Sequence, residues 1–555
     1  MTLGAFALVC VFFAVLVALA REASRAVREQ ARAVAIFATG TLLSLAAGSL
    51  LTVPSFLHAN FHANALLESI AAFPADPTHR ATYGRVSFLL LGALSAPFGH
   101  RLEAIAVINH GQLAVAITAL GALSWRLTGR LGAGLAAVAA GATFVPLVRV
   151  AGSEDAHVTA ALFGAISLLF ADVYGASRRT TALAVWVGAT VLMIHARQTF
   201  YLWAPISIAL VWARGGLREG LRGDRRALGG VAVIAAALAL RIGSTLGDES
   251  ERISVAAIPV LASDPQLAGG LFAHHPLLDV RRFAAAHLPL VVTGLVTLAR
   301  GGRSERTLAA GFGLAFAITL PFGLPVPGVE LAFRTPALLL GVTIAGVGAD
   351  WIARRLRSER SRAAATAALS AALIAAPLLS PGAALLTWQS ADWLEFRAVR
   401  ALAPQLPRRV RVVDTRAGEP APSYHPPVRA LAEAGLDVRR ARPDKAPDHE
   451  TAYVVVLGVR CYGRSLLEDL GIESPAALDR DGFRRVFAAI DEPPPTWPDE
   501  RPECARERAI GTPLGPSITI GPLADDPPFV RYGRPTVAVQ IVQVDPRLLA
   551  DAPPE

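Results

Sequence analysis

The chain has 555 residues, of which 53% are hydrophobic and only 17% are charged, and its mean hydropathy is +0.45. Soluble domains carry about a quarter charged residues, so this composition excludes an ordinary soluble protein and predicts a large surface that faces lipid. The formal net charge of +9 would indicate nucleic acid binding in a soluble chain. In a membrane protein, arginines retained at one face of the bilayer explain it.

Apolar segments recur along the first 388 residues and predict about 12 membrane-spanning helices, each needing roughly 17–25 residues. The first is expected to be a retained anchor and not a signal peptide, because its arginines follow the apolar run instead of preceding it. The candidate spans are 3–20, 33–53, 103–124, 131–149, 157–176, 180–196, 199–213, 227–243, 287–300, 307–323, 335–352 and 363–388.

Arginine divides the connecting segments into two classes that alternate along the chain. One class is Arg-rich and, with twelve spans, falls entirely on one side of the membrane: 21–32, 125–130, 177–179, 214–226, 300–306 and 353–362. The other class is poorer in Arg and richer in His, Asp and Glu: 54–102, 150–156, 244–286 and 324–334. Because arginine is retained on the cytoplasmic side, we expect a multi-pass protein of the cytoplasmic (inner) membrane with both termini outside the cytoplasm.

The apolar segment 86–98 is too short to span a membrane easily. Counting it as a span would move every later loop to the opposite side of the membrane. We therefore expect it to be an interfacial helix on the outer face.

Composition changes at about residue 389, where Pro, Arg, Asp and Glu replace the long apolar runs. We expect a transmembrane domain over 1–388 and a small extracytoplasmic α/β domain over 389–555. Cys461 and Cys504 both lie in the second domain, where a disulfide and two free thiols remain alternatives. The expected strands are 409–415, 452–459 and 537–544, the expected helices are 427–436 and 475–490, and loops are expected at 492–503 and 519–536.

The first outer segment, 54–102, concentrates polar residues directly after an apolar run. If this part is helical, His58 and His62 lie one turn apart on the same face, a spacing that can hold a metal. No third ligand is set by the spacing, and we predict no metal site. These histidines and Glu68 are candidates for a catalytic or binding role, and a polar face of an interfacial helix is the alternative.

The second outer segment holds an acidic pair, Glu154 and Asp155. Two carboxylates at a membrane boundary are costly unless they are solvated or partnered, and Arg149 and His157 are near enough in sequence to partner them. A catalytic role is one interpretation. A charged helix cap, with Ser153 starting the next helix, is the other.

Three stretches, 83–115, 144–175 and 189–210, together with the Arg197-Gln198-Thr199 sequence, resemble the GT-C glycosyltransferases. The similarity is greatest to the protein O-mannosyltransferase and aminoarabinose transferase branch and covers about a third of the chain. It implies a GT-C-like helical membrane fold and transfer of a sugar from a polyprenyl-phosphate donor to an acceptor glycan, lipid or protein at the outer membrane face. Membrane lipid and the lipid-linked sugar are the implied partners, with no nucleic acid and no further cofactor.

Such a transfer needs a base for the acceptor hydroxyl and cations for the departing phosphate. The family has an Asp or Glu early in the first outer loop, but residues 54–62 contain no acid. His58, His62, Glu68 and the acidic pair all remain candidates for the base, and so does a catalytically degenerate protein. The candidate phosphate ligands near outer helix ends are Arg149, Arg197, Arg241, Arg282 and Arg334, each of which can alternatively anchor the interface.

Two other classes of membrane protein compete with a transferase. A secondary transporter places ionisable groups near the bilayer midplane, where this chain offers only His110 and His195, and this argues against a transporter. A non-catalytic membrane protein with an extracytoplasmic binding domain remains open, because the first outer loop lacks the expected acid.

Overall fold

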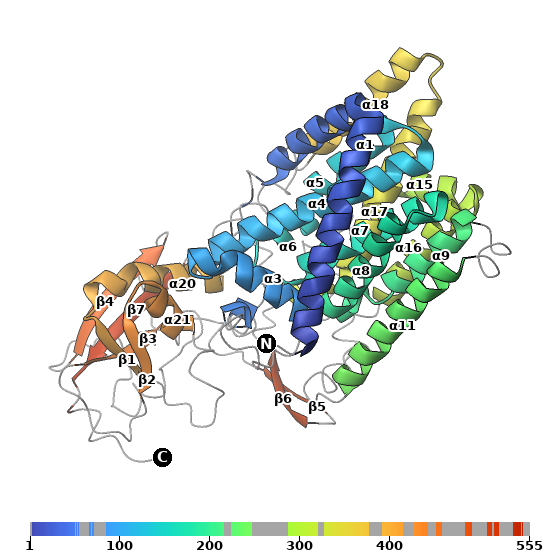
Figure 1. Cartoon of the computed structure of the whole chain (residues 1–555). Coiled ribbons are helices and arrows are strands. Elements are labelled where there is room, and N and C mark those ends of the chain that lie inside the picture. The colour runs from blue at the N-terminus through green and yellow to red at the C-terminus, as the bar shows by residue number, and fades with distance from the viewer. Residues whose placement is uncertain are drawn as a thin grey trace. The chain divides into compact units, whose positions relative to one another are not determined.

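The structure is a computed structural model of the chain (Figure 1). It describes isolated positions between residues 52 and 71, position 547, and the ranges 3–49, 85–215, 224–246, 287–319, 327–376, 391–413, 426–441, 451–457, 483–490, 508–512, 515–520 and 537–545. The chain forms two compact units, residues 1–54 with 69–387, and residues 55–68 with 388–555.

The described elements of the first unit are helices, and most of them coincide with the apolar segments expected to span a membrane. They are α1 (Leu3–Ser49), α3 (Arg85–Ser95), α4 (Leu102–Thr128), α5 (Leu131–Thr143), α6 (Val145–Ala151), α7 (His157–Ser177), α8 (Thr180–Ala196), α9 (Trp203–Gly215), α11 (Arg225–Leu246), α15 (Leu288–Arg300), α16 (Arg303–Thr319), α17 (Pro327–Arg354) and α18 (Glu359–Ala375).

Within the described residues, five helices are long and apolar enough to cross a membrane, and six if the bent pair α5 and α6 counts as one. Helices α8 and α15 are apolar but shorter. The protein is therefore a helical membrane protein.

Two predicted boundaries are wrong. Segment 21–32 was expected to be a loop, but it is helical within α1, and the backbone bends at Gln30 (φ −141°, ψ 42°). Figure 1 draws α1 as two dark blue arms that meet at this bend. Within this segment Glu22 pairs with Arg25 one turn later at 3.2 Å, a spacing that adds modestly to helix stability.

The second wrong boundary concerns the expected span 131–149, which breaks at Phe144 into α5 and α6 with a bend of 63°. Pro146 occupies the first turn of α6 and has no N–H for the preceding turn, which favours a break there. At the break the Phe144 N–H turns to the Gly141 carbonyl at 3.4 Å, and the carbonyl of Ala140 accepts a hydrogen bond from Nε2 of the buried His287 at 3.0 Å. The break is thus stabilised from outside the helix.

Segment 86–98 is helical as expected, forming α3 and a short 3₁₀ turn, Ala96–Phe98. Phe88 and Leu91 are buried, whereas Leu94 and Phe98 are exposed. This division into a buried and an exposed face is typical of an interfacial helix.

Small residues let α15 and α17 approach very closely. A Cβ atom added at Gly294 would overlap with the carbonyl oxygen of Ile344, and one added at Gly348 would overlap with the carbonyl oxygen of Leu290. Such close backbone approach is how membrane helices gain packing energy in lipid. A buried cluster lies beside this contact. It consists of alanines of α5 and α17 together with Leu290 and Leu373.

Ion pairs join residues from five of the six Arg-rich segments at one end of the helices, here called the Arg-rich end. Asp172, near the C-terminus of α7, is fully buried and binds two arginines from different segments. These segments therefore meet, as the charge pattern predicts. The contacts are Arg126 and Arg214 with Asp172 (2.7 and 2.5 Å), Arg179 with Glu22 (2.8 Å), Arg178 with Asp224 (2.7 Å), and Arg130 and Arg354 with Asp350 (3.7 and 2.6 Å).

Asp224 is a titratable residue at the Arg-rich end. It lies just before α11, outside the helices. Partial burial raises the pKa of its carboxyl. Hydrogen bonds from the Ala227 N–H, the Tyr174 hydroxyl and the Arg178 guanidinium, together with the Arg178 charge, lower it by more. The pKa of Asp224 therefore lies below its ordinary value of 3.8.

The second unit contains a five-stranded sheet in the order β2-β1-β3-β7-β4. Strand β1 pairs in parallel with β2 and β3, whereas β7 pairs antiparallel with β3 and β4. Helix α20 (Ala391–Leu402) packs on β4 and β7 and contacts α21 (Pro426–Glu433). The strands are β1 (Arg409–Val413), β2 (Asp437–Ala441), β3 (Ala452–Leu457), β4 (Phe483–Ile490), β7 (Val537–Val544) and a separate hairpin of β5 (Arg508–Thr512) and β6 (Gly515–Ile520).

The sequence pattern correctly predicts β1, β3, β7 and α21, but it is wrong for the second half of the expected helix 475–490. Residues 483–490 form strand β4, which pairs with β7 over eight positions. Phe483, Val486, Phe487 and Ile490 have helical spacing, which explains the prediction. Pairing with a neighbouring strand decides the outcome, because strand preference depends strongly on tertiary context.

Candidate functional site

The predicted acidic pair lies in the turn between α6 and α7, residues 152–156, here called the acidic turn. Glu154 and Asp155 are both fully buried. Ser153 Oγ donates to the Val150 carbonyl at 2.7 Å and accepts from the Asp155 N–H at 3.2 Å. The Ser153 hydroxyl therefore satisfies two backbone groups in and beside the turn, as buried backbone requires.

Asp155 takes the capping role that one interpretation assigned to Ser153, so that assignment is wrong. The cap residue of α7 is Ala156, and Asp155 Oδ1 accepts from the His157 N–H at 2.6 Å. A carboxylate at the start of a helix satisfies an orphan N–H and interacts favourably with the helix dipole.

Two polar side chains from other helices anchor the acidic turn. Asn109 Nδ2 in α4 donates to the carbonyls of Ser153 and Asp155 at 2.9 and 3.0 Å. Ser87 Oγ in α3 lies 3.1 Å from the Ala156 carbonyl and 3.3 Å from that of Ala196. Sequence reasoning missed both residues. The available signal for Asn109 was a polar amide inside an apolar helix, which usually marks a specific partner.

Asp155 also contacts the imidazole of His157, with Oδ1 2.6 Å from Nδ1. Nε of Arg197, which caps the C-terminus of α8, lies 3.3 Å from the same Nδ1. One nitrogen cannot both donate to Asp155 and accept from Arg197. The shorter contact favours a proton on Nδ1 shared with Asp155, which leaves the lone pair on Nε2.

A second pair of opposite charges joins α6 to the same turn. Arg149 in α6 is fully buried, interacts electrostatically with Glu154, and donates from Nη2 to the Gly152 carbonyl at 3.4 Å. Gly152 itself is required by space, because a Cβ there would lie 2.6 Å from a methyl group of Thr52. The buried arginine therefore balances the buried carboxylate.

The site thus combines two carboxylates, two arginines and one histidine at the end of α7 away from the Arg-rich end. A 21-residue helix is about 30 Å long, roughly the thickness of the bilayer hydrocarbon. Carboxylate and guanidinium charges balance each other, and His157 lies against one of the carboxylates. Within the described part of the chain, no group of three or more His, Cys, Asp and Glu side chains can hold a metal.

The structure brings together Arg149, Asp155 and Arg197 among the residues singled out from the sequence, with Glu154 in the same turn. Arg241 is buried in α11, which packs along α8. Arg334 lies in α17, and its side chain is outside the described residues. His58, His62, Glu68 and Arg282 also lie outside the described residues.

No known protein family matches the sequence, and no curated protein matches it. The fold is similar to two crystal structures of ArnT from Cupriavidus metallidurans. The structure bound to undecaprenyl phosphate is 15% identical, with a TM-score of 0.47, and the match covers 76% of this chain and 92% of ArnT. The apo structure is 13% identical, with a TM-score of 0.49, and the match covers 80% of this chain and 95% of ArnT.

Proposed function

We propose that the protein is a membrane glycosyltransferase that moves a sugar from a polyprenyl-phosphate donor to an acceptor at the outer face of the cytoplasmic membrane. The acidic turn carries this proposal. A histidine in contact with Asp155 and two arginines lie beside it, at one end of an apolar helix bundle. The sequence resemblance to GT-C glycosyltransferases supports the same reaction class.

The charged residues and the histidine in and beside the acidic turn each have a role in the proposed reaction. Asp155 orients His157, and Nε2 of His157 accepts the proton of the acceptor hydroxyl as its oxygen bonds to the anomeric carbon. The bond between that carbon and the donor phosphate breaks, and the electron pair leaves with the phosphate. Arg197 is only partly buried, so we assign it contact with this phosphate, whereas Arg149 neutralises Glu154.

The first outer segment supplies the competing candidates for the base. His58, His62 and Glu68 remain proposals, as do Arg241 and Arg334 as further phosphate ligands. If one of the three first-loop residues is the base, Asp155 and His157 hold the turn in place and take no proton.

We further propose the full topology of about 12 spans with the Arg-rich end in the cytoplasm. The meeting of five Arg-rich segments at one end supports it. In this topology the acidic turn and the domain 389–555 both lie on the extracytoplasmic side.

A non-catalytic membrane protein with an extracytoplasmic binding domain is the second candidate. The complete burial of Glu154 and Asp155 favours it, because a carboxylate that only caps a helix and pairs with neighbours can be structural.

The test is sugar transfer by the full-length protein in proteoliposomes supplied with polyprenyl-phosphate sugars. We expect Asp155→Asn to lower turnover about 100-fold or more, because His157 loses its orienting charge. Asp172→Asn is the matched control, since Asp172 is an equally buried, arginine-bound carboxylate at the other end of α7.

Turnover per folded molecule should be unchanged in Asp172→Asn. Full turnover in Asp155→Asn would refute the site. If the variants Glu68→Gln or His62→Ala abolish transfer while Asp155→Asn retains it, the base lies in the first outer segment. A wild type that transfers no sugar from any polyprenyl phosphate would favour the binding protein.

A further inference from the structure

The turn between α17 and α18 carries more positive charge than its neighbours neutralise. With Arg130 from the turn between α4 and α5, this region has six arginines and only two carboxylates, Asp350 and Glu359. The six are Arg130, Arg354, Arg355, Arg357, Arg360 and Arg362. Within the described part of the chain, carboxylates pair with the first two of them and with none of the last four.

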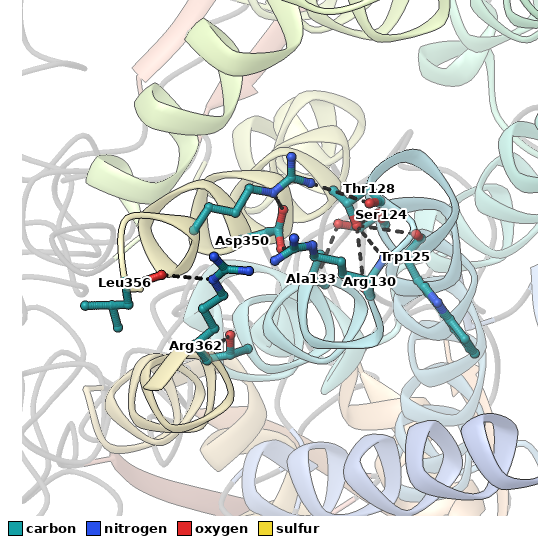
Figure 2. Close-up of polar contacts among 10 residues, drawn as sticks. Ser124, Trp125, Thr128, Arg130, Ala133, Asp350, Leu356 and Arg362 are labelled. Atoms are coloured by element: carbon teal, nitrogen blue, oxygen red, sulfur yellow. Dashed lines mark hydrogen bonds and ion pairs between the residues drawn. The ribbon is translucent and has the colours of Figure 1, made fainter. Parts of the chain in front are cut away.

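Asp350 is the centre of this charge. It is nearly buried and binds Arg354 at 2.6 Å and Arg130 at 3.7 Å. Figure 2 shows Arg362 pointing from α18 toward Arg130 and Asp350. Asp350 thus pairs with two of these three guanidiniums, and the three together exceed its charge by two.

Backbone contacts hold two of these guanidiniums in position. Arg362 Nε donates to the Leu356 carbonyl at 2.9 Å (Figure 2), and Arg354 Nη2 donates to the Thr128 carbonyl at 3.5 Å. Among the described residues, the Nη groups of Arg362 donate to no acceptor, so they can bind another one. Positioned guanidinium groups bind phosphate oxygens through pairs of hydrogen bonds.

Apolar side chains lie beside the arginines. Leu356 is 40% exposed within the turn, and the Arg355 guanidinium lies 4.1 Å from the ring centre of Trp351. Trp is enriched at membrane interfaces, and an exposed Leu next to arginines suits acyl chains below a charged headgroup. A free anion in water has no apolar part that could contact Leu356.

We propose that Arg130, Arg354 and Arg362, with Leu356, form a binding site for the phosphodiester of an anionic phospholipid. The phosphate supplies the negative charge that the group around Asp350 lacks, and the acyl chains cover Leu356. Basic pockets between helices at a membrane surface recognise anionic headgroups in this way. This site is independent of the proposed sugar transfer and lies at the other end of the bundle.

The test measures binding of short-chain phosphatidylglycerol to the purified full-length protein in neutral detergent, with phosphatidylcholine and inorganic phosphate as separate probes. We expect phosphatidylglycerol to bind and to raise the unfolding temperature. Arg362→Gln should weaken binding about tenfold, as expected for losing a charge-assisted contact. Asp350 keeps both of its ion-pair partners, Arg130 and Arg354, in this variant.

Arg306→Gln is the matched control. Arg306 is an exposed residue of another Arg-rich segment, and its Nε likewise donates to a backbone carbonyl, that of Gly302 at 3.4 Å. It should bind phosphatidylglycerol like the wild type. Equal losses in Arg362→Gln and Arg306→Gln would mean diffuse charge attraction and would overturn the site.

Leu356→Ser tests the lipid assignment with every arginine in place. We expect weaker phosphatidylglycerol binding in this variant. Binding that is unchanged, or matched by inorganic phosphate or phosphatidylcholine in the wild type, would refute an anionic lipid as the ligand.

Discussion

Asn109→Ala removes the amide that joins α4 to the acidic turn. The amide nitrogen donates to two carbonyls, those of Ser153 and Asp155, at 2.9 and 3.0 Å, and Asn109 is fully buried. Leaving a buried acceptor unpaired costs about 1–3 kcal/mol. Two carbonyls at the low end of that range lose about 2 kcal/mol together. The free energy needed to open the turn locally therefore falls by about 2 kcal/mol.

Hydrogen exchange measures this opening directly. The Asp155 N–H donates to Ser153 Oγ, and the His157 N–H donates to Asp155 Oδ1. A loss of about 2 kcal/mol makes their exchange about 30-fold faster, provided that exchange proceeds through local opening. The readout is mass spectrometry of the peptide over residues 150–157.

Gln112→Ala is the control on the same helix. Gln112 is also buried in α4, and its amide forms no hydrogen bond within the described part of the chain. Its truncation should leave exchange in the acidic turn unchanged. If Asn109→Ala exchanges at the wild-type rate, the two hydrogen bonds do not hold the turn and the reasoning is refuted.

Two further predictions concern stability. Gly348→Ala should destabilise the protein by about 2 kcal/mol or more, because the new Cβ meets the Leu290 carbonyl and a backbone cannot yield as a side chain can. Gly313→Ala has open space and should stabilise α16 by about 0.5–1 kcal/mol, and equal denaturation midpoints would contradict both. Because its folded-state pKa is lowered, the Asp224 carboxylate contributes stability that is complete above its unfolded pKa of 3.8 and is lost as pH falls below it. Asp224→Asn should therefore reduce stability near neutral pH and flatten its decline below about pH 4, and a wild-type acid profile in the variant would show that this carboxylate is not involved.

Local patterns in the sequence determined much of the helical architecture. The apolar run of α7 and the basic residues that follow it predict a helix over 157–176, and the structure has it over 157–177. Arg sorting predicts which connections share a side, because Arg-rich short loops are retained on the cytoplasmic side whatever the details of packing. The contact between Asp155 and His157 was also within reach, since the two residues are only two positions apart.

Only the tertiary structure decided the features that depend on residues distant in the chain. Asn109 meets the acidic turn across 44 residues, and His287 satisfies the broken α5 across 147. Residues 483–490 have helical spacing but pair as a strand with β7. In each case the deciding energy comes from a hydrogen-bond partner that the local sequence pattern cannot reveal. The sequence therefore shows which polar groups are present, and the tertiary structure determines which groups they pair with.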